Sequence, residues 1–293
     1  MAKKSKIIIV NFVLILLFLL IAETVVFLYE KIQTTAAMPF VLFKHKHSLN
    51  YYKNFFREPV GTEYNSEPIY LYGCSFAHGD FLEEKERPDY ILSELTKRPV
   101  YNFSMGGKGI QHALFIMQNQ EKVKPYPEYF IYICYSDQLR RLLEPCGVID
   151  NENFLNFKII NNRIVFYPEK TDFLQNTYLY RKLLQMFLYH NQEILSSDKT
   201  FKTFELFIKQ MNEEIHQNYP DSKFIFIFYD NSPFNKKQTE DLIKMENKQF
   251  KILNLPDILG DSFYENPKYK IPNDEHPSAA AWRVIIPEII KYM

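Results

Sequence analysis

The sequence predicts an α/β protein in which helices cover both faces of a central parallel β-sheet. Short apolar runs alternate with helical stretches from residue 69 onward, which is the pattern of repeated βα units. The strand candidates are almost continuously apolar, as strands covered on both faces should be. In such sheets the functional site lies at the carboxyl ends of the strands.

The elements follow one another in alternating order along the chain. Strands are expected at 69–73, 100–103, 129–135, 223–229 and 250–253. Helices are expected at 88–97, 110–121, 178–195, 202–217, 236–248 and 278–292. The last helix has apolar residues at helical spacing on one face, and Pro287 within it predicts a kink.

The first thirty residues differ in composition from the rest. Three lysines precede the hydrophobic stretch Ile7–Tyr29, and a helix that spans a bilayer needs roughly 20 residues. Basic residues on the amino side place that end in the cytoplasm. A cleaved signal peptide is the alternative, although its apolar region is usually only about 7–15 residues long. We therefore expect an anchor at 1–30, in the inner (cytoplasmic) membrane, with the remaining chain extracytoplasmic.

The rest of the chain divides into a connector and one domain. Residues 31–66 show no clear periodicity, whereas 67–293 carry the alternating pattern. An insertion is expected at about 138–175, and a hairpin is expected within it at 157–166. Two asparagines at the centre of that hairpin tolerate the positive φ of a tight turn.

The composition excludes several functional classes. Lys plus Arg and Asp plus Glu each number 35, so the zero formal charge gives no electrostatic basis for nucleic-acid binding. The three cysteines do not form a disulfide framework. His45 and His47 have no third ligand nearby, and neither a metal site nor a cofactor is expected.

A serine follows the first strand candidate, between two glycines. Ser75 lies between Gly73 and Gly79, where the backbone can turn sharply and hold a hydroxyl out of the sheet. Five of the eight glycines are at positions 73, 79, 106, 107 and 109. This clustering predicts two loops that face one site. An α/β-hydrolase elbow needs a glycine two residues after the serine, where this chain has Ala77.

Near the carboxyl terminus, an aspartate precedes a histidine by two residues. Side chains two apart in an extended loop point the same way, so Asp274 can reach the His276 ring. Pro277 suits the first helical position, which predicts that His276 is the approximate cap of the last helix. A histidine at a positive helix end tends to stay neutral, as a general base must. Taken alone the pattern is weak, because Asp and Asn are also common caps.

Together these motifs resemble the SGNH/GDSL hydrolase family over about residues 66–293. The residues that carry the resemblance are Gly73, Ser75, Gly79, Asn102, Gly107, Asp274, His276 and Pro277. The resemblance implies a three-layer, flavodoxin-like fold. It implies that Ser75 is the nucleophile, that His276 is the base oriented by Asp274, and that the Ser75 and Gly107 amides form the oxyanion hole.

The sequence departs from the family pattern in three ways. Family members often have the acid three residues before the histidine, where this chain has Asn273, although the two-residue spacing resembles that of the membrane-anchored, extracytoplasmic branch. Cys74 stands where the family usually has aspartate, and Ser136 stands where an asparagine completes the oxyanion hole. The expected third oxyanion donor is therefore Ser136, with Gln138 as a substitute only if the loop differs. Loss of one such donor costs about 10²–10³ in rate.

Four further residues are candidates for lining the substrate site: His78, Lys108, Asp137 and Arg140. Each also has a purely structural interpretation. His78 can be a rim residue, Lys108 a solvated loop lysine, and Arg140 or Arg141 a partner of nearby acids.

The expected function is a serine esterase or deacetylase that acts on an O-acylated cell-envelope glycan or lipid. An O-acetyltransferase with a sugar acceptor has the same triad, and a membrane acyl donor would be its partner. The remaining alternative is a non-catalytic glycan-binding protein that kept the fold.

Overall fold

The structure is a computed structural model that describes residues 17–18, 20–22, 24, 56–120, 122, 124–143, 156–167, 197–230, 234 and 236–293. Among these residues no helix is long and apolar enough to cross a bilayer. Most of the expected anchor, and the helix expected at 178–195, lie outside the described residues.

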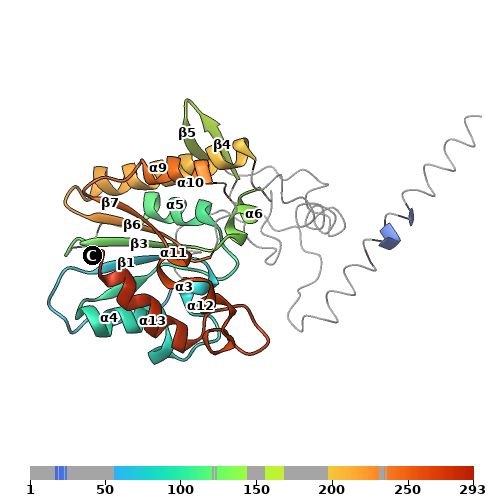
Figure 1. Cartoon of the computed structure of the whole chain (residues 1–293). Helices are drawn as coiled ribbons and strands as arrows, with labels where there is room; N and C mark the ends of the chain where they lie inside the picture. The colour runs from blue at the N-terminus through green and yellow to red at the C-terminus, as the bar shows by residue number, and fades with distance from the viewer. Residues whose placement is uncertain are drawn as a thin grey trace, which may run out of the picture.

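Five parallel strands form one sheet in the order β2-β1-β3-β6-β7, as the sequence predicts (Figure 1). The strands are β1 (Ile69–Gly73), β2 (Val100–Asn102), β3 (Tyr129–Cys134), β6 (Lys223–Phe228) and β7 (Phe250–Asn254). Because all five run in one direction, the chain leaves every strand at the same edge of the sheet.

The two faces of the sheet differ in chemistry because side chains alternate along a strand. In β6, for example, the phenylalanines of the run Lys223–Phe228 pack in one core and the isoleucines pack in the other. Tyr70, Tyr72, Phe130 and Tyr132 extend the aromatic face across β1 and β3. The aromatic layer therefore lies under one set of helices and the aliphatic layer under the other.

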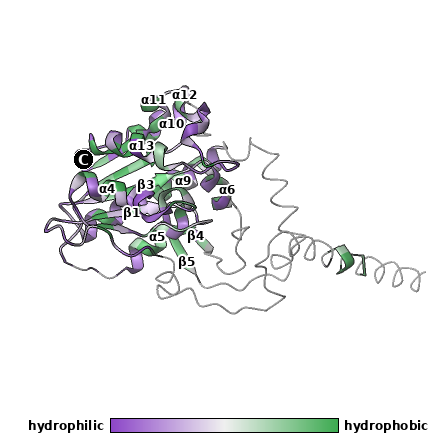
Figure 2. Ribbon diagram, turned by 90° about the horizontal axis from the view of Figure 1, so that it is seen from below, coloured by the Kyte–Doolittle hydropathy of each residue, from purple (hydrophilic) through white to green (hydrophobic). Residues whose placement is uncertain are grey.

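Helices cover both faces, which completes the predicted three layers (Figure 1). The aromatic face is covered by α5 (Ile110–Asn119), α6 (Asp137–Leu143), α9 (Asp198–Asn218) and α10 (Lys236–Ile243). The aliphatic face is covered by α3 (Ser75–His78), α4 (Pro88–Thr96), α11 (Leu255–Leu259), α12 (Asp261–Glu265) and α13 (Ala279–Ile290). Hydrophobic residues gather in the interior between the layers, and hydrophilic ones lie outside (Figure 2).

The predicted hairpin is present as β4 (Asn156–Ile160) and β5 (Arg163–Tyr167), which pair antiparallel. Asn161 and Asn162 form its turn with φ of 50° and 59°. The hairpin packs on the helices of the aromatic face, where Gln210 of α9 bonds both the amide and the carbonyl of Ile164. The Gln210 side chain therefore anchors the main chain of the hairpin to α9.

Several short elements were not expected from the sequence. These are α3, α6, α11, α12 and the 3₁₀ turns Glu84–Glu86 and Pro267–Tyr269. Helices of one or two turns are too short to show a hydrophobic period. The end of the expected connector also joins the fold, because Val60 forms a β-bridge with Val100.

Candidate active site

Ser75 is the first residue of α3, immediately beyond the carboxyl end of β1. Gly73 allows this sharp transition, since a Cβ there would lie 2.8 Å from the Ile133 carbonyl oxygen. The one-turn helix ends at Gly79, whose φ of 73° is left-handed and suits glycine. Ser75 is 8% exposed, and its backbone carbonyl accepts bonds from the Gly79 and Asp80 amides. The hydroxyl is thus held at the sheet edge by a rigid turn.

The second glycine loop lies beside this serine, as the sequence predicts. A Cβ at Gly106 would be 3.9 Å from Ser75 Cβ and 2.6 Å from Asp80 Oδ2. The next residue, Gly107, has a φ of 72°. Among the described residues, neither the Ser75 amide nor the Gly107 amide donates a hydrogen bond. Two backbone donors are therefore free next to the serine.

Asn102, at the end of β2, ties the two loops together. Its side-chain amide donates to the Ala77 carbonyl at 2.9 Å, and its Oδ1 accepts from the Ser104 amide at 3.0 Å. The residue is 1% exposed. A buried side chain that satisfies one group in each loop fixes their separation.

Asp274 holds His276, as expected. One carboxylate oxygen of Asp274 accepts from the His276 backbone amide at 2.8 Å and also contacts ring Nδ1. Burial acts to raise the pKa of Asp274, but the hydrogen bonds from His276 outweigh it and lower this pKa below its usual value. The carboxylate is therefore ionised at neutral pH and fixes the proton on Nδ1.

The prediction that His276 caps the last helix is wrong. Helix α13 begins at Ala279, and its cap is Ser278, whose hydroxyl accepts from the Ala281 amide. Pro277 instead forms a β-bridge with Lys270. The loop closes by main-chain pairing before the helix starts, so His276 precedes the cap by two residues.

The His276 ring lies over α3. Its centroid is 4.8 Å from the ring of Phe76, which follows Ser75, and 5.2 Å from that of Phe81. Its Nε2 atom is buried and has no hydrogen-bond partner among the described residues. The Ser75 hydroxyl likewise has no partner there, so no hydrogen bond links serine and histidine. Of the expected triad, Asp274 and His276 are therefore paired, whereas Ser75 and His276 are not hydrogen-bonded to each other.

Ser136, the expected third oxyanion donor, is already engaged. Its backbone amide donates to Asp230 Oδ1 at 2.8 Å, and its hydroxyl donates to Oδ2 of the same carboxylate. Both donors are used, which argues against the expected role of Ser136 in the oxyanion hole. Burial raises the pKa of Asp230 to about 6, and the bonds from Ser136 oppose this increase.

Gln138 does not replace the missing asparagine either. The residue is fully buried, accepts a bond from Tyr132 and donates to the Ile133 carbonyl at 3.3 Å. These bonds hold the start of α6 against β3. Both side chains that the sequence offered as a third donor are thus committed to the fold.

The other candidate lining residues have mixed positions. Asp137 pairs with Arg141 at 2.9 Å, which agrees with the structural interpretation of this arginine. Lys108 is only 7% exposed, so the prediction of a solvated lysine is wrong; its carbonyl accepts from Arg141 at 3.2 Å. The side chain of Arg140 is outside the described part of the structure.

His78 belongs to a charged cluster that the sequence analysis missed. Its Nδ1 contacts Asp80 and lies 3.3 Å from an Arg57 guanidinium nitrogen, while Arg57 Nε donates to the His78 carbonyl at 3.4 Å. Asp80 is the residue whose Oδ2 faces Gly106. Arg57 comes from the expected connector, where no local pattern indicated a role. Asp80 was more accessible to prediction, because it directly follows the Ser75 turn.

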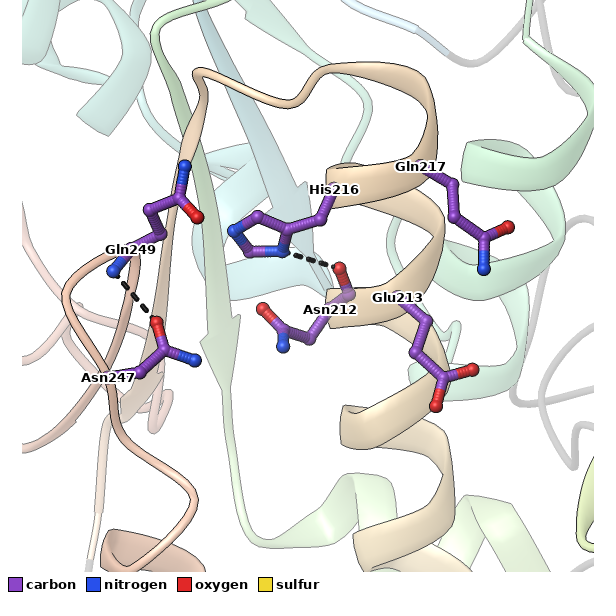
Figure 3. A pocket seen from close by; sticks show the side chains of 6 residues that line it. All are labelled: Asn212, Glu213, His216, Gln217, Asn247 and Gln249. Carbon is purple, nitrogen blue, oxygen red and sulfur yellow. Dashed lines mark hydrogen bonds between the residues drawn. The ribbon is translucent and has the colours of Figure 1, made fainter.

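Within the described residues there is no group of three or more His, Cys, Asp and Glu side chains suited to a metal. One hollow, of about 450 Å³, lies at the opposite edge of the sheet, where strands β6 and β7 begin. In Figure 3, Asn212 and His216 project from α9 towards Asn247 and Gln249 on the facing loop. A second cavity, of about 190 Å³, adjoins the Asp274–His276 loop.

No protein-family model and no curated protein sequence matches this chain. Its structural neighbours are GDSL lipolytic proteins and carbohydrate esterases. One is described as a lipolytic protein of the G-D-S-L family, from Desulfitobacterium hafniense; identity is 11%, coverage is 78% of this chain and 100% of that one, and the TM-score is 0.47.

An acetyl xylan esterase from Butyrivibrio proteoclasticus shares 8% identity, with 78% of this chain and 63% of that chain covered and a TM-score of 0.42. A family two carbohydrate esterase from Clostridium thermocellum, solved with cellohexaose, shares 9% identity, with 76% and 62% covered and a TM-score of 0.41. The chain therefore spans less than two thirds of the length of these two esterases.

Proposed function

We propose that this protein is a serine esterase that hydrolyses O-acyl esters of a glycan or lipid through Ser75, His276 and Asp274. The observation that carries the proposal is the state of His276. Asp274 holds one ring nitrogen, and the other is buried without a partner while the ring rests on the residue next to Ser75. A buried imidazole nitrogen left as an acceptor is costly unless a donor arrives during function.

The reaction follows from these positions. Ser75 Oγ attacks the ester carbonyl carbon while His276 Nε2 takes the hydroxyl proton, and Asp274 stabilises the imidazolium that forms. The Ser75 and Gly107 amides donate to the oxyanion. His276 then returns the proton to the leaving alkoxide. Water, deprotonated by the same histidine, releases the acid and restores Ser75.

A non-catalytic binding protein is the second candidate, and one observation favours it. Asp230 occupies both Ser136 donors, so the oxyanion hole of this proposal has two backbone donors and no side-chain donor. Two donors are enough for a slow esterase, because each contributes about 10²–10³ in rate.

Labelling of the full-length chain with a fluorophosphonate separates the two candidates. We expect covalent modification of Ser75, its absence in Ser75→Ala, and strongly reduced labelling in His276→Ala. The matched control is His216→Ala, which removes a histidine at the opposite edge of the sheet and should label normally. A wild-type chain that does not label at Ser75, while the control variants fold, contradicts the esterase proposal.

We also propose that the apolar segment near the amino terminus anchors the protein in the membrane and that the substrate therefore belongs to the cell envelope. This part of the proposal rests on that segment and not on the site. An amino-terminal reporter found on the outer side of the membrane would contradict the proposed anchoring while leaving the chemistry of the site unaffected.

A further inference from the structure

The cavity beside the Asp274–His276 loop is lined mainly by aromatic side chains. Six rings contribute to it, those of Phe76, Tyr135, Tyr229, Phe263, Tyr264 and Tyr269. Three charged residues, Asp230, Lys270 and Glu275, complete the lining. Its volume of about 190 Å³ is smaller than the roughly 300–1,000 Å³ typical of sites for drug-sized ligands. The cavity therefore suits one small ring rather than an extended chain.

This cavity is lined by chain neighbours of the candidate catalytic residues. Phe76 follows Ser75 in the chain, and Glu275 lies between Asp274 and His276. The rings of Tyr135 and Phe76 stack with their centroids 4.2 Å apart. The centroid of the His276 ring lies 4.8 Å from that of Phe76. A ligand held in the cavity thus lies next to the groups that carry the proposed chemistry.

The lining combines flat apolar faces with charged hydrogen-bonding groups. A pyranose ring has the complementary chemistry, because its C–H faces pack on aromatic rings and its hydroxyls bond to carboxylate and ammonium groups. An acyl chain, in contrast, could not form hydrogen bonds with the charged groups that line the cavity. A quaternary ammonium would meet the positive charge of Lys270, which pairs with Glu275 at 2.5 Å.

We infer that this cavity binds a single pyranose ring of the substrate, next to His276. The inference rests on the proposed function for the identity of the reacting ester, but not for the binding of the sugar. Aromatic rings position the sugar, and the Lys270–Glu275 pair and Asp230 recognise its hydroxyls.

Sugar binding is tested without catalysis in the full-length Ser75→Ala protein. The probes are the methyl β-glycosides of glucose, galactose and N-acetylglucosamine, measured by ligand-detected NMR. We expect at least one to bind, and the added substitution Lys270→Ala to weaken its binding roughly tenfold, as for loss of a charged hydrogen bond. Lys270 is 38% exposed in its side chain, so this change leaves the core intact. Lys291→Ala, on an exposed ion pair near the carboxyl terminus, is the control.

Two kinetic substrates then locate the sugar relative to Ser75. In the otherwise wild-type chain, Lys270→Ala should lower kcat/KM for a mono-O-acetylated methyl glucoside, which keeps free hydroxyls, roughly tenfold more than it lowers kcat/KM for p-nitrophenyl acetate. Equal losses for both esters, or binding of none of the three glycosides, would overturn the inference. Sugar binding without labelling of Ser75 would instead refute the esterase and leave the cavity assignment intact.

Discussion

The carboxylate of Asp230 accepts hydrogen bonds from both the amide and the hydroxyl of Ser136. Asp230 follows β6 and Ser136 follows β3, and these strands are neighbours in the sheet. The loop that would carry an oxyanion-hole asparagine is therefore fastened to the next strand by an acidic residue. The hydrogen bonds of Ser136 to Asp230 give the residue at position 136 a structural role that can be tested directly.

Replacement of Ser136 by alanine should affect stability more than activity. The hydroxyl is bonded to Asp230, so its removal takes no donor from an oxyanion, and kcat/KM for p-nitrophenyl acetate should change less than about threefold. Loss of a hydrogen bond to a buried carboxylate should destabilise the fold by about 1.5–3 kcal/mol, measured by urea unfolding at pH 8. A fall in kcat/KM of about 10²–10³ would instead place Ser136 in the oxyanion hole.

Asp230 should make stability depend on pH in a predictable direction. Its folded pKa of about 6 lies above the ordinary value of 3.8, so the folded state keeps a proton that the unfolded state has lost. Stability contributed by this group is therefore lost as pH rises from about 4 to 6. Relative to wild type, Asp230→Asn should gain about 1–3 kcal/mol of unfolding free energy between pH 4 and 7. Denaturant unfolding at several pH values measures this, and parallel pH profiles for the two proteins would disprove it.

Asp274→Asn should retain the fold and lose most of the activity. The asparagine side chain keeps the size of the carboxylate but cannot stabilise an imidazolium or fix the Nδ1–H tautomer. We expect kcat/KM for p-nitrophenyl acetate to fall about 10³-fold or more. Asp221→Asn, at the other edge of the sheet, serves as the control. Near-normal turnover by Asp274→Asn would remove Asp274 from the mechanism.

Gly106→Ala should impair the site through a steric clash with Asp80. The new methyl group would meet Asp80 Oδ2 at 2.6 Å, next to Ser75. Fluorophosphonate labelling of Ser75 should slow at least about tenfold, and the double variant Gly106→Ala/Asp80→Ala should recover part of the rate, because the clashing oxygen is gone. If the Asp80→Ala change gives no recovery, the Gly106 substitution acts by another route.

Much of the fold could be predicted because it depends on local patterns. Apolar runs bounded by turn residues located all five strands of the sheet, and Asn161-Asn162 located the hairpin turn. The close approach of the two glycine loops could also be predicted, because the carboxyl ends of parallel strands lie at one edge of the sheet. The shortest helices could not be predicted, because a helix of one turn is too short to show a hydrophobic period.

The sequence by itself determined the parallel sheet, the position of Ser75 at the end of β1, and the pairing of Asp274 with His276, because each depends on residues close together in the chain. Only the tertiary structure decided which distant groups complete the site. Asp230 meets Ser136, Arg57 meets His78, and six aromatic rings from α3, α12, a 3₁₀ turn and the segments after β3 and β6 line one cavity. Such contacts are set by strand order and packing, which bring together residues that no local spacing relates.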